Sequence, residues 1–287
     1  MNPLAQALVS GLLTGLVYAL IAAGLSLIFG VMEIVNFAHG EFLMLSMYLS
    51  FFLNASLGWD PLAALPLNAA LLFVLGVVVY YALIRRVLRA PMLAQIFATF
   101  GLGVFLQAAA QFLWKPDFRT VGATVVSGTR IAMGGVFVSG PQLVAAGGAV
   151  ATTLALWWLL ARTGTGRALL ATAEDRTAAA LMGINANHMF ALAWGLGAAC
   201  VGIAGGLLST FYYVFPQVGS QFALIAFVAV ALGGFGSVVG AFAGGILIGV
   251  VESLAGVFVA PAVKNLFVFG IYLVVVLVRP RGLVGKQ

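Results

Sequence analysis

Charged residues are scarce in this sequence of 287 residues, in which Asp, Glu, Lys and Arg together make up 7%. A soluble domain carries roughly 25% of such residues, so this chain has too few charges to cover a surface that faces water. Hydrophobic residues account for 63% of the chain, and lipid is the solvent that fits this composition. The sequence therefore predicts an all-α integral membrane protein with several transmembrane helices.

Motifs of catalysis and nucleotide binding are also missing. The sequence contains no G-x-x-x-x-G-K-[ST] loop, no H-E-x-x-H pair and no G-x-S-x-G elbow. Its two histidines and its single cysteine, Cys200, provide too few ligands for a metal site and no internal disulfide. We therefore expect no enzyme, no metal site and no cofactor bound to this chain. The net charge of +6 does not indicate nucleic acid, because the basic residues lie in small groups between apolar runs.

Apolar segments of membrane-spanning length follow one another along the chain. A crossing needs about 20 apolar residues, and we expect about eight or nine transmembrane helices in a single domain over residues 1–287. Residues 1–32 carry no charged side chain, so the first segment is expected to remain as a helix and not to be removed as a signal peptide. The expected segments are 4–30, 41–57, 62–84, 92–113, 141–161, 189–211, 221–258 and 261–279.

The stretch 221–258 is too long for one crossing and is rich in glycine. Glycine-rich breaks in membrane helices free backbone groups to face a cavity. We therefore expect a broken or re-entrant pair of half-helices here, interrupted around Gly233, Gly234, Gly236 and Gly240.

Three groups of basic residues predict the orientation of the chain. By the positive-inside rule, all three groups are expected on the cytoplasmic side, with the stretch 115–140 and the N-terminus outside and the C-terminus inside. The groups are Arg85, Arg86 and Arg89; Arg162, Arg167 and Arg176; and Arg279, Arg281 and Lys286.

The segment EIVNFAHGE (33–41) places two carboxylates, an asparagine and a histidine between two apolar runs. Charged groups at membrane depth are costly and usually line a cavity or pair with each other. The candidate residues for a translocation path or its gate are Asn36, Phe37, His39, Glu41, Gly233, Gly234 and Gly236.

Two structural interpretations of the same segment stay open. In one, His39 bonds to Glu41 or to a backbone carbonyl, while Asn36 caps a helix that starts near Phe37. In the other, the segment is a polar turn at the membrane surface.

The segment 162–188 is the longest charged stretch on the expected cytoplasmic side. Thr163 or Thr165 can cap a helix, Gly183 is expected to end it, and Asn185 can cap the next one. Apolar residues recur at helical spacing on one face. Such a short amphipathic helix either lies on the membrane or inserts into a groove on a soluble partner.

Small residues recur four apart in several of the expected helices, for example at Gly11 and Gly15 and at Gly202 and Gly206. This spacing lets helices approach closely in lipid, either within the chain or against a second membrane subunit. Glu252 is the only carboxylate after Arg176, and we expect it to pair with Lys264 across a short turn.

Four segments carry a resemblance to a known family, and it extends over nearly the whole chain. The sequence resembles permease subunits of bacterial branched-chain amino acid ABC importers, of the shorter, LivH type. The segments are GLVYALIAAGLSLIFGVMEIVNFAHGEFLML (15–45), ATAEDRTAAALMGIN (171–185), AFVAVALGGFGSVVGAFAGGILIGVVES (226–253) and VRPRGLVG (278–285).

The resemblance implies a multi-pass permease subunit in the bacterial inner (cytoplasmic) membrane, working in an ATP-driven importer for branched-chain amino acids. The implied partners are a second permease subunit of the LivM type, two cytosolic ATP-binding subunits that hold the ATP, a periplasmic solute-binding protein and membrane lipid. It also implies that the stretch from Glu174 to Gly183 couples the permease to an ATPase, with Asp175 and Ala179 inside it. Two alternatives stay open: a permease for another small polar solute, such as urea, amides or aromatic acids, and a stand-alone secondary transporter.

Overall fold

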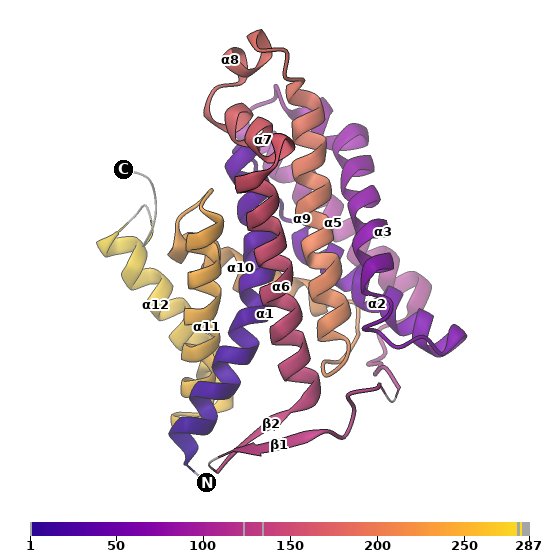
Figure 1. Cartoon of the computed structure of the whole chain (residues 1–287), viewed down its shortest axis with the longest axis vertical. Coiled ribbons are helices and arrows are strands. Elements are labelled where there is room, and N and C mark those ends of the chain that lie inside the picture. The colour runs from indigo at the N-terminus through magenta and orange to yellow at the C-terminus, as the bar shows by residue number, and fades with distance from the viewer. Residues whose placement is uncertain (1, 123, 134, 280–281, 283–287) are drawn as a thin grey trace.

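The structure is a computed structural model that describes residues 2–122, 124–133, 135–279 and 282, and it is a bundle of helices (Figure 1). The long helices are α1 (Pro3–Met32), α2 (His39–Leu57), α3 (Leu65–Val79), α5 (Met92–Trp114), α6 (Gly140–Arg162), α9 (Ala186–Leu208), α10 (Val218–Gly233), α11 (Val238–Phe258) and α12 (Lys264–Val278). The shorter elements are η1 (Tyr80–Ile84), α4 (Arg85–Val87), β1 (Arg130–Met133), β2 (Val136–Ser139), α7 (Gly164–Glu174), α8 (Arg176–Leu181) and η2 (Pro261–Val263).

Seven helical stretches in the described part of the chain are long and apolar enough to cross a membrane. The helices α10 and α12 are apolar but shorter. This arrangement confirms the predicted all-α membrane architecture, and the expected number of eight or nine helices approximates it. A small antiparallel hairpin of β1 and β2, with Arg130 paired to Ser139, was not predicted from the sequence.

The centre of the bundle is formed by α1 and α9, whose apolar spans are 72% and 78% buried. The helix α1 packs against α11, α9, α10 and α6, while α9 also contacts α3 and α2. The span of α5 is only 17% buried and lies at the edge. Hydrophobic burial does not drive association in lipid, so close packing must hold the central helices together.

Glycines provide that close packing inside the chain. A Cβ added to Gly249 in α11 would lie 2.3 Å from the Cα of Gly15 in α1. A Cβ on Gly202 in α9 would lie 2.9 Å from the backbone oxygen of Asn68 in α3. These small-residue stripes therefore pack within the chain, as the first of the two interpretations proposed.

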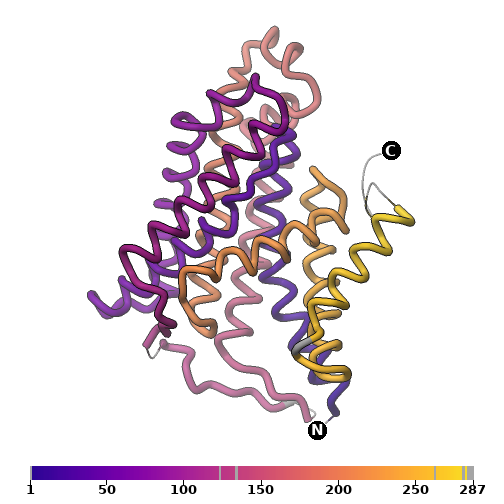
Figure 2. The backbone as a smooth tube through the Cα atoms, turned by 180° about the vertical axis from the view of Figure 1, so that it is seen from behind, coloured from indigo at the N-terminus to yellow at the C-terminus, as the bar shows by residue number. Residues whose placement is uncertain are grey.

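The long apolar stretch near the C-terminus is broken, as predicted, between α10 and α11. Gly234 and Gly236 adopt positive φ angles of 104° and 81°, which glycine reaches at little steric cost. The hydroxyl of Ser237 then accepts a 3.0 Å hydrogen bond from the N–H of Gly240 and caps α11. From behind, α10 crosses the bundle obliquely (Figure 2).

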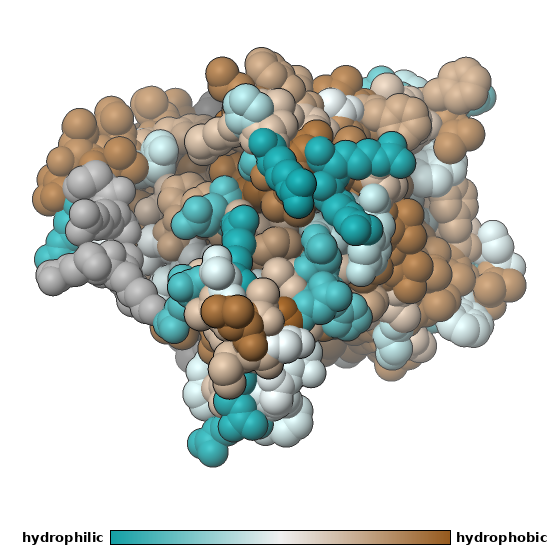
Figure 3. Space-filling model, turned by 90° about the horizontal axis from the view of Figure 1, so that it is seen from above, coloured by the Kyte–Doolittle hydropathy of each residue, from teal (hydrophilic) through white to brown (hydrophobic). Residues whose placement is uncertain are grey.

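The two ends of the bundle differ in charge. One end, which we call the basic end, carries α4, α7 and α8. Arg85 and the 183–189 segment line one cavity there, and hydrophilic side chains gather on this end between hydrophobic side chains at the rim (Figure 3). Arg279 follows the last residue of α12, whereas the predicted Arg281 and Lys286 lie outside the described residues.

The opposite end, which we call the hairpin end, carries the N-terminus and the β1–β2 hairpin (Figure 1). The side chain of Gln6 in α1 donates to the carbonyl of Phe137 and accepts from its N–H, both at 2.8 Å. The stretch 115–140 therefore lies at the end opposite Arg85 and Arg162, as the charge distribution predicted.

The segment 162–188 forms two helices, so the prediction of one continuous amphipathic helix was wrong. Thr163 caps α7 as expected, accepting a 3.0 Å hydrogen bond from the N–H of Gly166. Asp175 then leaves the helix and caps α8, because its carboxylate accepts from the N–H groups of Thr177 and Ala178 at 2.7 and 3.0 Å. Such local bonds compete with helix continuation.

The end of this segment follows the prediction. Gly183 has a φ of 82° after α8, a conformation that favours glycine at a helix end. Asn185 caps α9 by accepting a 3.2 Å hydrogen bond from the N–H of His188.

Candidate functional site

The polar segment 33–41 connects α1 to α2 and begins with a sharp turn. Glu33 ends α1 with a φ of 59°, and its N–H donates to the carbonyl of Phe29 at 2.7 Å. The buried Asn36 accepts a 3.1 Å hydrogen bond from the N–H of Ala38. Asn36 thus stabilises the turn before α2, which begins at His39 rather than near Phe37.

His39 is fully buried and bonds to a backbone carbonyl, one of the two partners that the structural interpretation offered. Its Nε2 lies 3.0 Å from the carbonyl oxygen of Ile21, which fixes the start of α2 against the middle of α1. The hydroxyl of Thr99 in α5 donates to the carbonyl of Val35 at 3.0 Å. The segment is therefore attached to both α1 and α5.

Glu41 connects three helices through polar side chains. Its Oε1 accepts from the hydroxyl of Ser220 at 3.1 Å, and Gln107 donates to that hydroxyl at 3.4 Å. Its other oxygen, Oε2, has no hydrogen-bond partner among the described residues. A Cβ on Gly219 would lie 2.7 Å from Oε2, so glycine leaves room for the carboxylate.

Phe37 is the member of the candidate set in this segment that reaches the surface. Its side chain is 36% exposed, whereas Asn36 and His39 are fully buried and Glu41 is 5% exposed. Its ring lies 5.0 Å from that of Phe227 in α10, measured between centroids. Phe37 therefore covers the junction between the polar segment and α10.

The glycine-rich break lies against the end of α1. A Cβ on Gly30 would lie 3.0 Å from the Cα of Gly236, so the two backbones are in contact. Gly233 packs against Gly240 across the break, and Gly234 forms the turn.

A cavity of about 620 Å³ at the basic end brings three predicted segments together. Its lining includes Glu33 from the polar segment, Glu174 from α7, and Gly236 and Ser237 from the break. Ser26 in α1, a buried residue, also lines it. These segments lie far apart in the sequence, so only the fold shows that they share one space.

Arg176 connects the α7–α8 segment to the polar segment. It donates a 3.0 Å hydrogen bond to the carbonyl of Met32 at the end of α1, and its guanidinium lies 4.9 Å from the ring of Phe190. Among the predicted coupling residues, Ala179 is 4% exposed, while Asp175, the cap of α8, and Gly183, in the turn after α8, are exposed. Sequence reasoning used Arg176 only as an orientation signal and missed this contact.

Two further polar residues of the site were also missed. Ser220 and Gln107 lie in apolar helices with no motif around them, and 179 residues separate Ser220 from Glu41. Their only sequence signal is that polar side chains are rare in these helices, where they usually find a partner.

A family model described as "Branched-chain amino acid transport system / permease component" matches residues 7–277 of this chain. That match covers more than nine-tenths of the sequence. The chain belongs to this permease family. Its members are transport permeases rather than enzymes, so the expectation of a non-enzyme is met at that level.

Full-length relatives of the permease carry matching names. BraD, a high-affinity branched-chain amino acid transport system permease protein of Pseudomonas aeruginosa, is 34% identical, with 98% of this chain and 95% of BraD aligned. LivH of Escherichia coli (strain K12), named likewise, is 32% identical over 98% of this chain and 95% of LivH. A probable LivH of Methanocaldococcus jannaschii is 28% identical, with 93% of this chain and 88% of that protein aligned. No solved structure matches the permease significantly.

Proposed function

We propose that this permease is the membrane-spanning subunit of an ATP-driven importer for branched-chain amino acids in the bacterial inner membrane. The observation that carries the proposal is its alignment over 98% of its length with BraD and LivH. The bundle of apolar helices and the buried polar residues Asn36, His39 and Glu41 inside it agree with a solute pathway.

Exposed apolar side chains support the proposed partners. Leu181 and Met182 are 84% and 82% exposed at the tip of the α7–α8 segment, where they can insert into a groove of a cytosolic ATP-binding subunit. Two such subunits would hold the ATP. The exposed apolar side chains of α5 and α12 face lipid or a second permease subunit of the LivM type, and a periplasmic binding protein would deliver the solute.

The proposed mechanism passes motion from the α7–α8 segment to the break. When ATP binding closes the cytosolic subunits, α8 moves and Arg176 pulls on the end of α1 through the Met32 carbonyl. The contact between Gly30 and Gly236 transmits this shift to the break between α10 and α11. Packed helices then rock between outward-open and inward-open states, with Phe37 and Glu41 beside the solute.

Purification of the chain from native membranes, followed by reconstitution, tests this proposal. We expect a second permease and P-loop ATPases to co-purify, and we expect proteoliposomes with the binding protein to take up L-leucine, L-isoleucine and L-valine only when ATP is supplied. A homo-oligomer that transports in response to an ion gradient would contradict the proposal. Uptake of urea, amides or aromatic acids in place of these amino acids would contradict the proposed solute.

A further inference from the structure

A second polar group lies in the hairpin half of the bundle, away from the polar segment 33–41. The predicted ion pair is present: Lys264 Nζ lies 2.6 Å from Glu252 Oε1, with side chains 42% and 11% exposed. Glu252 belongs to the membrane-spanning helix α11, where a carboxylate is costly and usually marks a functional site. Its carboxylate also interacts with the hydroxyl of Tyr18 in α1.

Two cavities open beside this ion pair. One of about 380 Å³ lies between α10, α11 and α12, and one of about 410 Å³ lies towards α6 and the start of α1. Both volumes fall in the range of about 300–1,000 Å³ that is typical of small-molecule sites. Tyr18, Tyr212, Phe222, Glu252 and Lys264 line both of them, so the ion pair stands at their shared boundary.

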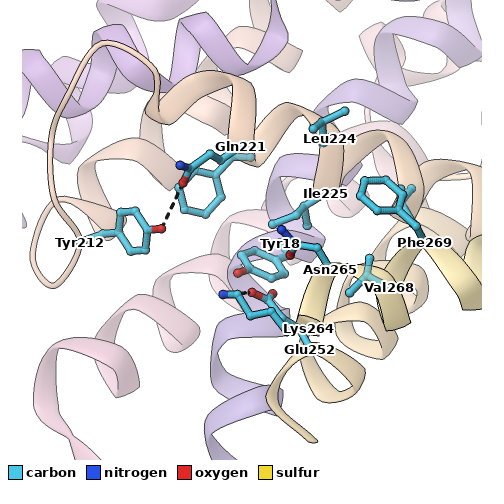
Figure 4. A pocket seen from close by; sticks show the side chains of 12 residues that line it. Tyr18, Tyr212, Gln221, Leu224, Ile225, Glu252, Lys264, Asn265, Val268 and Phe269 are labelled. Carbon is cyan, nitrogen blue, oxygen red and sulfur yellow. Dashed lines mark hydrogen bonds and ion pairs between the residues drawn. The ribbon is translucent and has the colours of Figure 1, made fainter. Parts of the chain in front are cut away.

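The first cavity has a polar end and an apolar end (Figure 4). Around the ion pair stand Tyr18, which interacts electrostatically with Glu252, and Asn265. Burial raises the pKa of the Tyr212 hydroxyl, and the positive charge of Lys264 acts in the opposite direction. This hydroxyl donates a hydrogen bond to Gln221 Oε1 at 3.3 Å.

The apolar end of the same cavity adjoins the polar end. It consists only of aliphatic and aromatic side chains, with no charged group among them. Its lining residues are Leu224, Ile225, Val228, Val268 and Phe269.

This arrangement matches the chemistry of an α-amino acid with an apolar side chain. A zwitterion needs an acceptor for its ammonium group, a cation for its carboxylate and a recess for its side chain. Glu252, Lys264 and the apolar end of the cavity provide these three elements within one space. A lone acid in an apolar helix offers no such combination, and a purely structural ion pair does not require a cavity on each side.

We propose that this cavity is a recognition site for zwitterionic α-amino acids with apolar side chains, in which Glu252 binds the ammonium and Lys264 binds the carboxylate. The site rests on the proposed function, and it goes further by placing a solute contact in the permease itself. It lies towards the hairpin end, so a solute arriving from that end reaches it before the polar segment 33–41. The bound zwitterion separates Lys264 from Glu252, because each charge changes its partner.

The test uses the permease purified together with its partner subunits in lipid nanodiscs, without the binding protein. Saturation-transfer NMR and radioligand binding measure the affinity for L-leucine, for leucinamide, which lacks the carboxylate, and for 4-methylpentanoate, which lacks the ammonium. We expect L-leucine to bind and both analogues to bind at least about tenfold more weakly, because each analogue leaves one charge unpaired. Equal binding of all three compounds would overturn the proposal.

Two variants separate recognition from stability. We expect Glu252→Gln to weaken L-leucine binding about tenfold or more. The double variant Glu252→Lys with Lys264→Glu keeps the opposite charges together, so we expect it to recover any melting temperature that Glu252→Gln loses. In this variant each charge of the zwitterion meets a like charge, so L-leucine binding stays weak. Wild-type L-leucine affinity in the exchanged variant would show that the pair is structural only. Asp117→Asn, an exposed acid at the hairpin end, is the matched control and keeps wild-type affinity.

A variant outside the ion pair tests the apolar end of the cavity. Leu224 is 54% exposed, so Leu224→Trp fills the recess without disturbing buried packing. We expect it to lower the affinity for L-leucine more than that for glycine, and equal losses would count against the site. A wild-type complex that imports L-leucine while all cavity variants keep its KM overturns the site alone. A wild-type complex that imports no branched-chain amino acid overturns the site and the proposed function together.

Discussion

At the scale of residues, burial separates the members of the polar segment 33–41 into two groups. Asn36 and His39 are fully buried and hold backbone turns in place. Phe37 reaches the surface, whereas Glu41 is nearly buried and accepts a hydrogen bond from Ser220. A solute or a moving helix can contact the second group without disturbing the first.

Phe37→Ala tests this separation. We expect uptake to fall severalfold while folding is largely kept, because the lost contact with Phe227 contributes only about 1 kcal/mol. The measurement is initial uptake in proteoliposomes normalised to the amount of folded complex. Phe112→Ala on α5, where the ring is 86% exposed, is the control, and an equal loss in both variants would remove Phe37 from the pathway.

Arg176→Gln tests the transmission from α8 to α1. The change removes the hydrogen bond to Met32 and the contact with Phe190, at a cost of about 1 kcal/mol for such a partly exposed group. We expect ATP hydrolysis by the complex to continue while uptake falls. Arg167→Gln, an exposed charge in the same segment, should leave both rates unchanged. A parallel fall of hydrolysis and uptake in Arg176→Gln would contradict the proposed transmission.

At the scale of elements, the close crossing of α1 and α11 depends on glycines, which have no side chain at the contact. Gly249→Val places a Cβ where the Cα of Gly15 lies only 2.3 Å away, so the two helices must separate. We expect a loss of about 1–3 kcal/mol in stability, as for other overpacked cores, and a lower melting temperature in detergent. Gly256→Ala lies on the same helix with open space around it and should not lower the melting temperature. Equal stability of both variants would contradict the close contact.

Most helices were predictable because residues close to each end in the sequence determine where the helix begins and ends. The expected segments 92–113 and 141–161 correspond to α5 and α6 within one residue at each end, since turn-forming and charged residues flank both apolar runs. The expected segment 62–84 starts too early, because the carboxylate of Asp60 accepts from the N–H of Leu62 and forms a turn before α3.

The site was less predictable than the helices, for physical reasons. The amphipathic pattern continues through Asp175, whereas the side-chain cap of Asp175 interrupts the helix there. The sequence pattern alone does not show whether the helix continues or stops at this residue. The contacts of Glu41 with Ser220 and of Arg176 with Met32 depend on how distant helices pack. The roles of the candidate residues in transport stay predictions.

At the scale of the whole molecule, the separation of charges predicts sidedness. Cys200 is buried, so the native chain should not react with a membrane-impermeant maleimide. We expect Thr165→Cys at the basic end to react only in inverted membrane vesicles and Val125→Cys at the hairpin end to react only in right-side-out vesicles. Both positions are exposed. The reverse pattern would place the basic end outside and contradict the orientation.

The helix α1 is attached at both of its ends. Gln6 binds the β1–β2 hairpin at one end, and the carbonyl of Met32 binds Arg176 at the other. Its 30 residues measure about 45 Å, whereas the hydrocarbon core of a bilayer is about 30 Å thick. A bilayer whose thickness does not match α1 must therefore tilt the helix or deform around it. Because the same helix connects α8 to the break, the acyl-chain length of the lipid acts on the helix that transmits the motion.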